Sequence, residues 1–165
     1  MRYAVLGLLD GIITAVGLTS SALISGHPIG LREAVAIAVV VATINGLTSF
    51  VAEYSHQRAS LRDIEYRISL RSTGRILRSL VHRRALTRSL RSAMLMFLWS
   101  LAGASSVLIP ASIKAAFGLY ALGAVVLAAS VGLARSPAEL GEWLIMLSAA
   151  AAIGLAVGLL SPLAT

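Results

Sequence analysis

The sequence of 165 residues contains no cysteine and few charged residues. The absence of cysteine excludes disulfides and thiolate metal sites. Charged residues make up 13% of the chain and hydrophobic residues 58%, whereas soluble globular domains carry about 25% charged residues. A soluble fold of this size would leave much of that apolar surface uncovered. The composition therefore predicts an integral membrane protein built as one domain, residues 1–165.

Long apolar runs account for most of the sequence. A bilayer-spanning helix needs about 20 mostly apolar residues. Five stretches qualify, at residues 3–26, 31–54, 93–113, 115–134 and 140–163. The first run is too long for the apolar core of a cleaved signal peptide, so we expect it to be retained. The expected fold class is all-α, with five transmembrane helices and a tight hairpin between the third and fourth.

Acidic residues are scarce, and basic residues are concentrated in one segment. Ten arginines lie between Arg58 and Arg91, and the formal net charge is +7. Basic residues favour the cytoplasmic side of a membrane, so residues 55–92 are expected to form a cytoplasmic, Arg-rich insertion. Apolar residues recur there at helical spacing, which predicts a basic amphipathic helical segment, broken near Gly74. Five spans then place the N-terminus inside and the C-terminus outside.

The arginines of this segment indicate a binding surface. Basic amphipathic surfaces bind anionic lipid headgroups, which is the interpretation we favour. A docking platform for a partner protein or a second subunit is the alternative. Nucleic acid is not expected, because no aromatic residues are interleaved with the arginines. The expected contact residues are Arg58, Arg62, Arg75, Arg78, Arg83 and Arg84.

Small residues in the first apolar run suggest close helix contact. Gly7 and Gly11 are four residues apart, a spacing that lets membrane helices approach closely. Because two-fold dimers are the commonest oligomers, we predict a homodimer with the first span at or near the two-fold axis.

Asp10 is a carboxylate inside an apolar run. A charged side chain at such depth costs about 2.5–3.5 kcal/mol on insertion scales. We favour a role in binding a cation or a proton, and a structural pairing with an arginine or a neighbouring helix is the alternative. Thr14 follows one turn later. Its hydroxyl either lines a polar path or bonds to a carbonyl of its own helix.

The second apolar run ends in a further group of polar side chains. Asn45, Thr48 and Ser49 share one helical face, and Glu53 lies four residues beyond Ser49. Because the first two spans are antiparallel, Glu53 should return to the depth of Asp10. Two carboxylates at similar depth make an oxygen-rich site that suits a divalent cation. We therefore predict Asp10 and Glu53 as metal ligands, with a solvated interfacial acid as the alternative for Glu53.

His56 lies three residues after Glu53, on the same helical face. Di-iron carboxylate bundles use this spacing, although a single such pair at a helix end is more often an interfacial or capping pair. No nucleophile–base pair or metal-activating cluster is visible, so an enzyme is not expected, nor any cofactor beyond a transported ion. The possible ligand or pathway residues are Asn45, Thr48, Ser49, His56 and Thr14.

Four short motifs resemble those of the vacuolar iron transporter family. Residues 10–18, DGIITAVGL, are similar to its DG(L/I)(V/I)T signature, and residues 51–55, VAEYS, are similar to its GEY(V/S)S element. LIP at residues 108–110 and GEW at residues 141–143 also resemble family elements. The similarity follows the same order and the same five-span layout along nearly the whole chain.

The resemblance implies a dimer of five-helix subunits that moves ferrous iron or manganese out of the cytosol, in exchange for protons. It matches Asp10 and Glu53 to the family's intramembrane acids. The chain departs from the family at Thr48 and Ser49, where a methionine is frequent, and at residues 58–91, where an acidic metal-binding domain is usual. It thus resembles an atypical member without that domain. A non-transporting membrane interaction protein, binding lipid or a partner through its arginines, is the alternative function.

Overall fold

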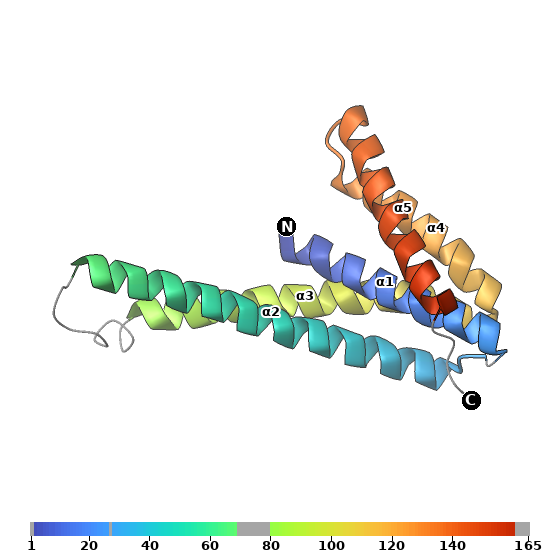
Figure 1. Ribbon diagram of the computed structural model, residues 1–165, viewed down its shortest axis with the longest axis horizontal. Coiled ribbons are helices and arrows are strands. Elements are labelled where there is room, and N and C mark those ends of the chain that lie inside the picture. The colour runs from blue at the N-terminus through green and yellow to red at the C-terminus, as the bar shows by residue number, and fades with distance from the viewer. Residues whose placement is uncertain (1, 27, 69–79, 161–165) are drawn as a thin grey trace.

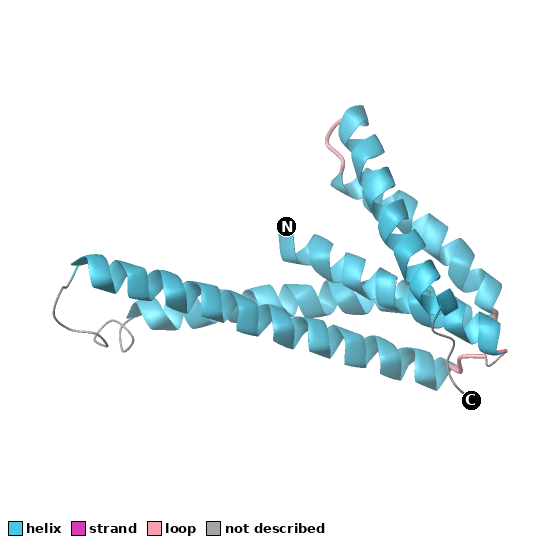
Figure 2. Cartoon of the chain, viewed as in Figure 1, coloured by secondary structure: helices cyan, strands magenta, loops and turns pink. Residues whose placement is uncertain are grey.

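The computed structural model describes residues 2–26, 28–68 and 80–160, with the backbone alone at residues 2, 61–68, 80–82 and 115. Within these ranges the chain forms five helices and no strand (Figures 1 and 2). They are α1 (Arg2–Ser25), α2 (Leu31–Ile68), α3 (Leu80–Ile113), α4 (Ala115–Leu133) and α5 (Pro137–Leu160). Each helix is long and apolar enough to cross a bilayer. The predicted fold class, an all-α membrane protein with five spanning helices, is confirmed.

Two helices are much longer than the spans predicted from the sequence. At about 1.5 Å per residue, the 38 residues of α2 and the 34 residues of α3 cover about 57 and 51 Å, against about 30 Å for the hydrocarbon core. The basic parts of α2 and α3 run side by side beyond the other helices (Figure 1). We call this part of the molecule the basic end.

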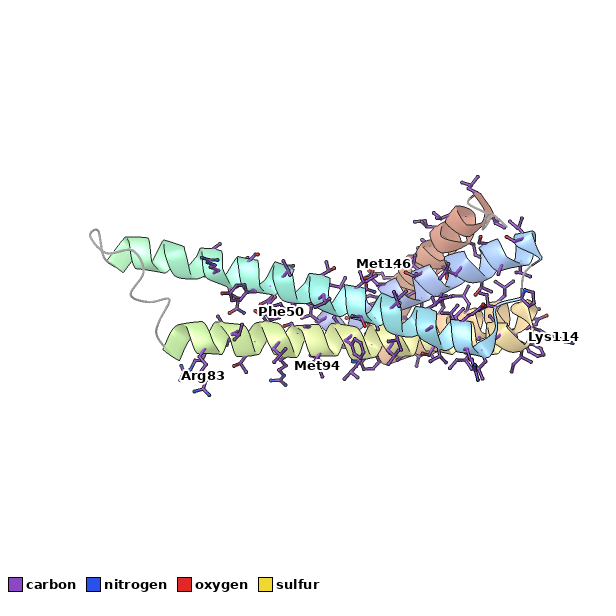
Figure 3. The ribbon with its side chains drawn as sticks, turned by 90° about the horizontal axis from the view of Figure 1, so that it is seen from below. Phe50, Arg83, Met94, Lys114 and Met146 are labelled. Atoms are coloured by element: carbon purple, nitrogen blue, oxygen red, sulfur yellow. The ribbon has the colours of Figure 1, made fainter. Side chains whose placement is uncertain are left out.

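The described parts of the Arg-rich segment are helical, as expected. They are not a separate amphipathic element, however, because residues 55–68 continue α2 and residues 80–92 begin α3. The predicted break near Gly74 lies outside the described residues. Figure 3 shows Arg83 at the basic end and Lys114 at the opposite end of the molecule. Lys114 alone separates α3 from α4, which confirms the tight hairpin.

α1 is the central helix and contacts all the other four. Ile12 and Val16 are fully buried. A Cβ atom at Gly7 would lie 2.6 Å from the carbonyl oxygen of Met96, and one at Gly11 would collide with the carbonyl oxygen of Ser100. The face of α1 that suggested a dimer contact is therefore packed against α3 of the same chain. The small-residue spacing gives no reason to place α1 at a two-fold axis.

The α4–α5 pair is inclined to α2 and α3 (Figure 1). α5 is anchored on α1 by small residues, since a Cβ at Gly154 would lie 2.8 Å from the carbonyl oxygen of Ile13, and one at Gly158 would collide with that of Gly17. α1 ends at Ser25 and is followed by Gly26, whose φ of 68° is a left-handed conformation that favours glycine. These contacts hold α1 between α3 and α5, and so fix the position of Asp10.

Candidate cation site

A cavity of about 390 Å³ lies between α1, α2 and α3 near the basic end. It brings together all but one of the seven side chains predicted as ligands or pathway residues. The lining residues are Tyr3, Leu6, Asp10, Asn45, Thr48, Ser49, Ala52, Glu53, His56 and Met96. The two predicted metal ligands, one on α1 and one on α2, thus share one cavity.

One polar stripe of α2 forms most of the lining. Asn45, Ser49, Glu53 and His56 recur every three or four residues, so they lie on the same side of the helix. The lipid-facing side of α2 carries exposed apolar residues such as Val40 and Leu47. This division fixes the rotation of α2, because turning it would bury apolar side chains against α1 and bring polar ones to lipid.

Asp10 enters the cavity from α1. It lies eight positions after the first residue of the helix, which corresponds to about 12 Å along the helix axis. Its side chain is partly buried. The backbone beside it is fixed, because Gly11 is packed against α3. The carboxylate is therefore held well inside the apolar run, where it lines the cavity.

Glu53 is the more strongly bonded of the two acids. Its carboxylate accepts a hydrogen bond from the hydroxyl of Tyr3 on α1 and another, at 2.8 Å, from Nε2 of Gln57. The bond to Tyr3 joins α1 to α2 across the cavity. The sequence analysis did not identify Tyr3. Its position two turns before Asp10 places both residues on one face of α1, and this spacing could have indicated that Tyr3 belongs to the site.

Ser49 carries an oxygen atom that is available for a ligand. Its side chain is only 8% exposed, and its Oγ atom has no hydrogen-bond partner among the described residues. Buried hydroxyls are normally hydrogen-bonded. Asn45 differs, because its Nδ2 donates to Oγ of Ser100 on α3 at 2.8 Å. Because Nδ2 is the donor of this bond, the amide oxygen of Asn45 remains as a possible acceptor or ligand atom.

Met96 is a cavity residue that the sequence did not reveal. The iron transporter motif that the chain resembles often has a methionine near Thr48 and Ser49 on α2, and this chain has none there. The structure instead brings the buried Met96 to the cavity from α3. A thioether is a soft ligand that suits transition metals better than calcium or magnesium. Only the crossing of α1 and α3 shows which methionine of α3 faces Asp10.

Thr14 and His56 were both predicted as possible ligand or pathway residues, and only His56 lines the cavity. Thr14 lies outside the cavity lining, and its hydroxyl donates to the carbonyl oxygen of Asp10 at 2.8 Å. It is thus bonded within its own helix, which was the alternative considered for it. His56 lines the cavity but is exposed. No three His, Asp or Glu side chains cluster as a metal site in the described part of the chain.

The arginines predicted to contact lipid or a partner are described only in part. Arg58, Arg83 and Arg84 are exposed. The other three predicted contacts lie outside what the structure describes, as side chains or entirely; they are Arg62, Arg75 and Arg78.

Comparison with protein-family models, with curated proteins and with solved structures finds no match to this chain. The function therefore has to be argued from the cavity itself.

Proposed function

We propose that this protein transports divalent metal cations, ferrous iron or manganese, across a membrane. The observation that carries the proposal is the shared cavity, which Asp10 and Glu53 line together with Met96 and Ser49. The hydroxyl of Ser49 has no hydrogen-bond partner among the described residues. Carboxylate and hydroxyl oxygens suit hard divalent cations, and the thioether shifts the preference toward transition metals.

The charges of the cavity support a cation as cargo. Asp10 and Glu53 are the only acids among the described lining residues, which include no lysine or arginine. A carboxylate inside a span is costly, and a bound cation offsets this cost by pairing with it. Asn45 and Ser49 provide neutral oxygens on the same stripe of α2. A site with few charged ligands also binds a cation less tightly. Weaker binding allows a transported ion to be released.

The orientation we propose rests on the basic end. An excess of arginine favours the cytoplasmic side of a membrane, and in that orientation the cavity lies toward the cytoplasmic side. Export from the cytosol in exchange for protons is what the resemblance to the vacuolar iron transporters implies. One of the two acids would take up the proton when the cation leaves. In this orientation the N-terminus is cytoplasmic and the C-terminus is outside.

The test is cation uptake by the purified protein in liposomes, with Fe²⁺, Mn²⁺, Co²⁺ and Zn²⁺ compared. Asp10→Asn should abolish uptake, because the amide keeps an oxygen ligand but removes the charge that replaces the hydration of the ion. Glu142→Gln is the matched control, since it removes an exposed carboxylate on α5 that lies outside the cavity lining. Its uptake should equal that of the wild type.

Two results would refute the proposal. One is wild-type uptake by a well-folded Asp10→Asn protein, which would remove Asp10 from the mechanism. The other is that the wild type moves none of the four ions. The protein would then be better described as a membrane interaction protein that acts through its arginines.

A further inference from the structure

A second and larger hollow adjoins the cavity at the basic end. It has a volume of about 880 Å³ and lies between the last described turns of α2 and the first turns of α3. Glu53 and His56 line both hollows, so the two lie next to each other. We call the larger one the arginine groove. Its lining residues are Glu53, His56, Gln57, Ser60, Arg83, Arg84, Ala85, Thr87, Arg88 and Arg91.

Arginines of α3 dominate one wall of the groove. Arg84, Arg88 and Arg91 are spaced four and three residues apart, so they lie on one face of the helix. All three are exposed, and none forms an ion pair with a described carboxylate. Like charges at this spacing repel one another. The face is therefore strongly positive and is not neutralised by the described part of the chain.

The opposite wall of the groove is polar rather than acidic. α2 presents His56, Gln57 and Ser60 at helical spacing. Glu53 is the single acid among the described lining residues, and its carboxylate already accepts hydrogen bonds from Tyr3 and Gln57. The groove thus contains several guanidinium groups and further neutral hydrogen-bond donors. Its one described carboxylate already accepts hydrogen bonds, so the groove attracts anions.

The geometry of the guanidinium N–H donors indicates which kind of anion the groove binds. A guanidinium group presents a planar fork of N–H donors that matches the oxygens of a phosphate. Arg84 and Arg91 are separated by about 10 Å along the axis of α3, so several forks can surround one phosphate-bearing group. The groove also lies next to the ends of the apolar runs, near residue 54 on α2 and near residue 93 on α3. This is the level of lipid headgroups.

We propose that the arginine groove binds a phosphate-bearing anion, held by Arg84, Arg88 and Arg91 and by the polar side chains of α2. The phosphate belongs to an anionic lipid headgroup or to a soluble phosphate compound. A further consequence rests on the proposed transport function. Because the groove adjoins the cavity, the bound phosphate neutralises the arginines at its mouth and raises the local concentration of divalent cations.

The test measures binding directly and does not depend on transport. The full-length protein, freed of lipid in a neutral detergent, is titrated separately with dioctanoyl phosphatidylglycerol, with dioctanoyl phosphatidylcholine and with inorganic pyrophosphate. Bound molecules are counted by native mass spectrometry. The wild type should bind phosphatidylglycerol or pyrophosphate well above phosphatidylcholine. Preference for phosphatidylglycerol assigns the phosphate to a lipid, and preference for pyrophosphate assigns it to a soluble compound.

Single variants decide whether the arginine groove is the site. Arg88→Gln should weaken binding about ten-fold, as expected for the loss of one charge-assisted hydrogen bond. Arg135→Gln removes the same charge from the exposed connection between α4 and α5, outside the groove, and should bind like the wild type. Equal losses in both variants, or no loss in Arg88→Gln, would overturn the proposal.

Transport assays separate this inference from the proposed function. In liposomes of phosphatidylcholine, adding the preferred anion should raise the rate of Mn²⁺ uptake by the wild type and not by Arg88→Gln. A protein that binds the anion as described but moves no cation would refute the transport function and support the anion site. Equal stimulation of Arg88→Gln and wild type would overturn the proposed effect on the cavity.

Discussion

Replacing Gly11 by alanine tests the helix crossing that builds the cavity. The new Cβ atom would collide with the carbonyl oxygen of Ser100 and lie 2.8 Å from the backbone nitrogen of Ala104. An unstrained contact to carbon needs about 3.5–4.0 Å. Both neighbours are backbone atoms of α3, so no side chain can turn away. The two helices must separate or shift along each other.

The expected cost follows from overpacking of a well-packed core, which destabilises proteins by about 1–3 kcal/mol. Gly123→Ala on α4 is the matched control, because a Cβ there meets nothing within 4 Å. That variant should be neutral or more stable by up to about 1 kcal/mol, the gain in helix propensity. The free energy of unfolding is measured by denaturant titration in mixed micelles. Equal stability of Gly11→Ala and Gly123→Ala would refute the crossing of α1 and α3 described here.

Three further predictions concern topology and the cavity. Because the chain lacks cysteine, Arg135→Cys should be labelled from the cytoplasmic side and Lys114→Cys from the other; the reverse pattern contradicts the orientation. The double-mutant cycle of Asn45→Ala and Ser100→Ala should give a coupling of about 0.6 kcal/mol, and at most about 1.7, typical of hydrogen bonds between membrane helices. Ser49→Ala should keep wild-type stability, because its Oγ loses no described hydrogen bond, yet should raise the KM for Mn²⁺. An unchanged KM would exclude Ser49 as a ligand.

The spans were predictable because each is a long apolar run bounded by polar residues. Their limits agree with the helices to within one residue at residues 26–31 and at Lys114, and α5 begins three residues earlier than predicted. The apolar runs did not show that α2 and α3 continue past them as helices at the basic end, through residues 55–68 and 80–92. Hydropathy detects where a helix leaves the apolar core, and it carries no signal for whether the helix then stops.

The α2 part of the candidate site was predictable from spacing alone. Asn45, Ser49, Glu53 and His56 lie on one helix, where a repeat of three or four residues determines a shared face. Met96 was not predictable, because its position depends on how α1 crosses α3. The glycines of α1 were recognised as a contact face but assigned to a second subunit. A small-residue pattern shows that a helix packs closely, and it does not say against which neighbour.

The two hollows differ in how strongly water and salt weaken their charges. The arginines of the groove are exposed, and charges in solvent are screened over about 8 Å at physiological ionic strength. Asp10 is partly buried between helices, where charges interact more strongly because the effective dielectric constant is lower. If the protein transports cations as proposed, a cation would first meet the repulsion of the arginines, which counterions or a bound phosphate can cancel. It would then meet the attraction of Asp10, which salt screens less. Arginines at the mouth are thus compatible with a cation site behind them.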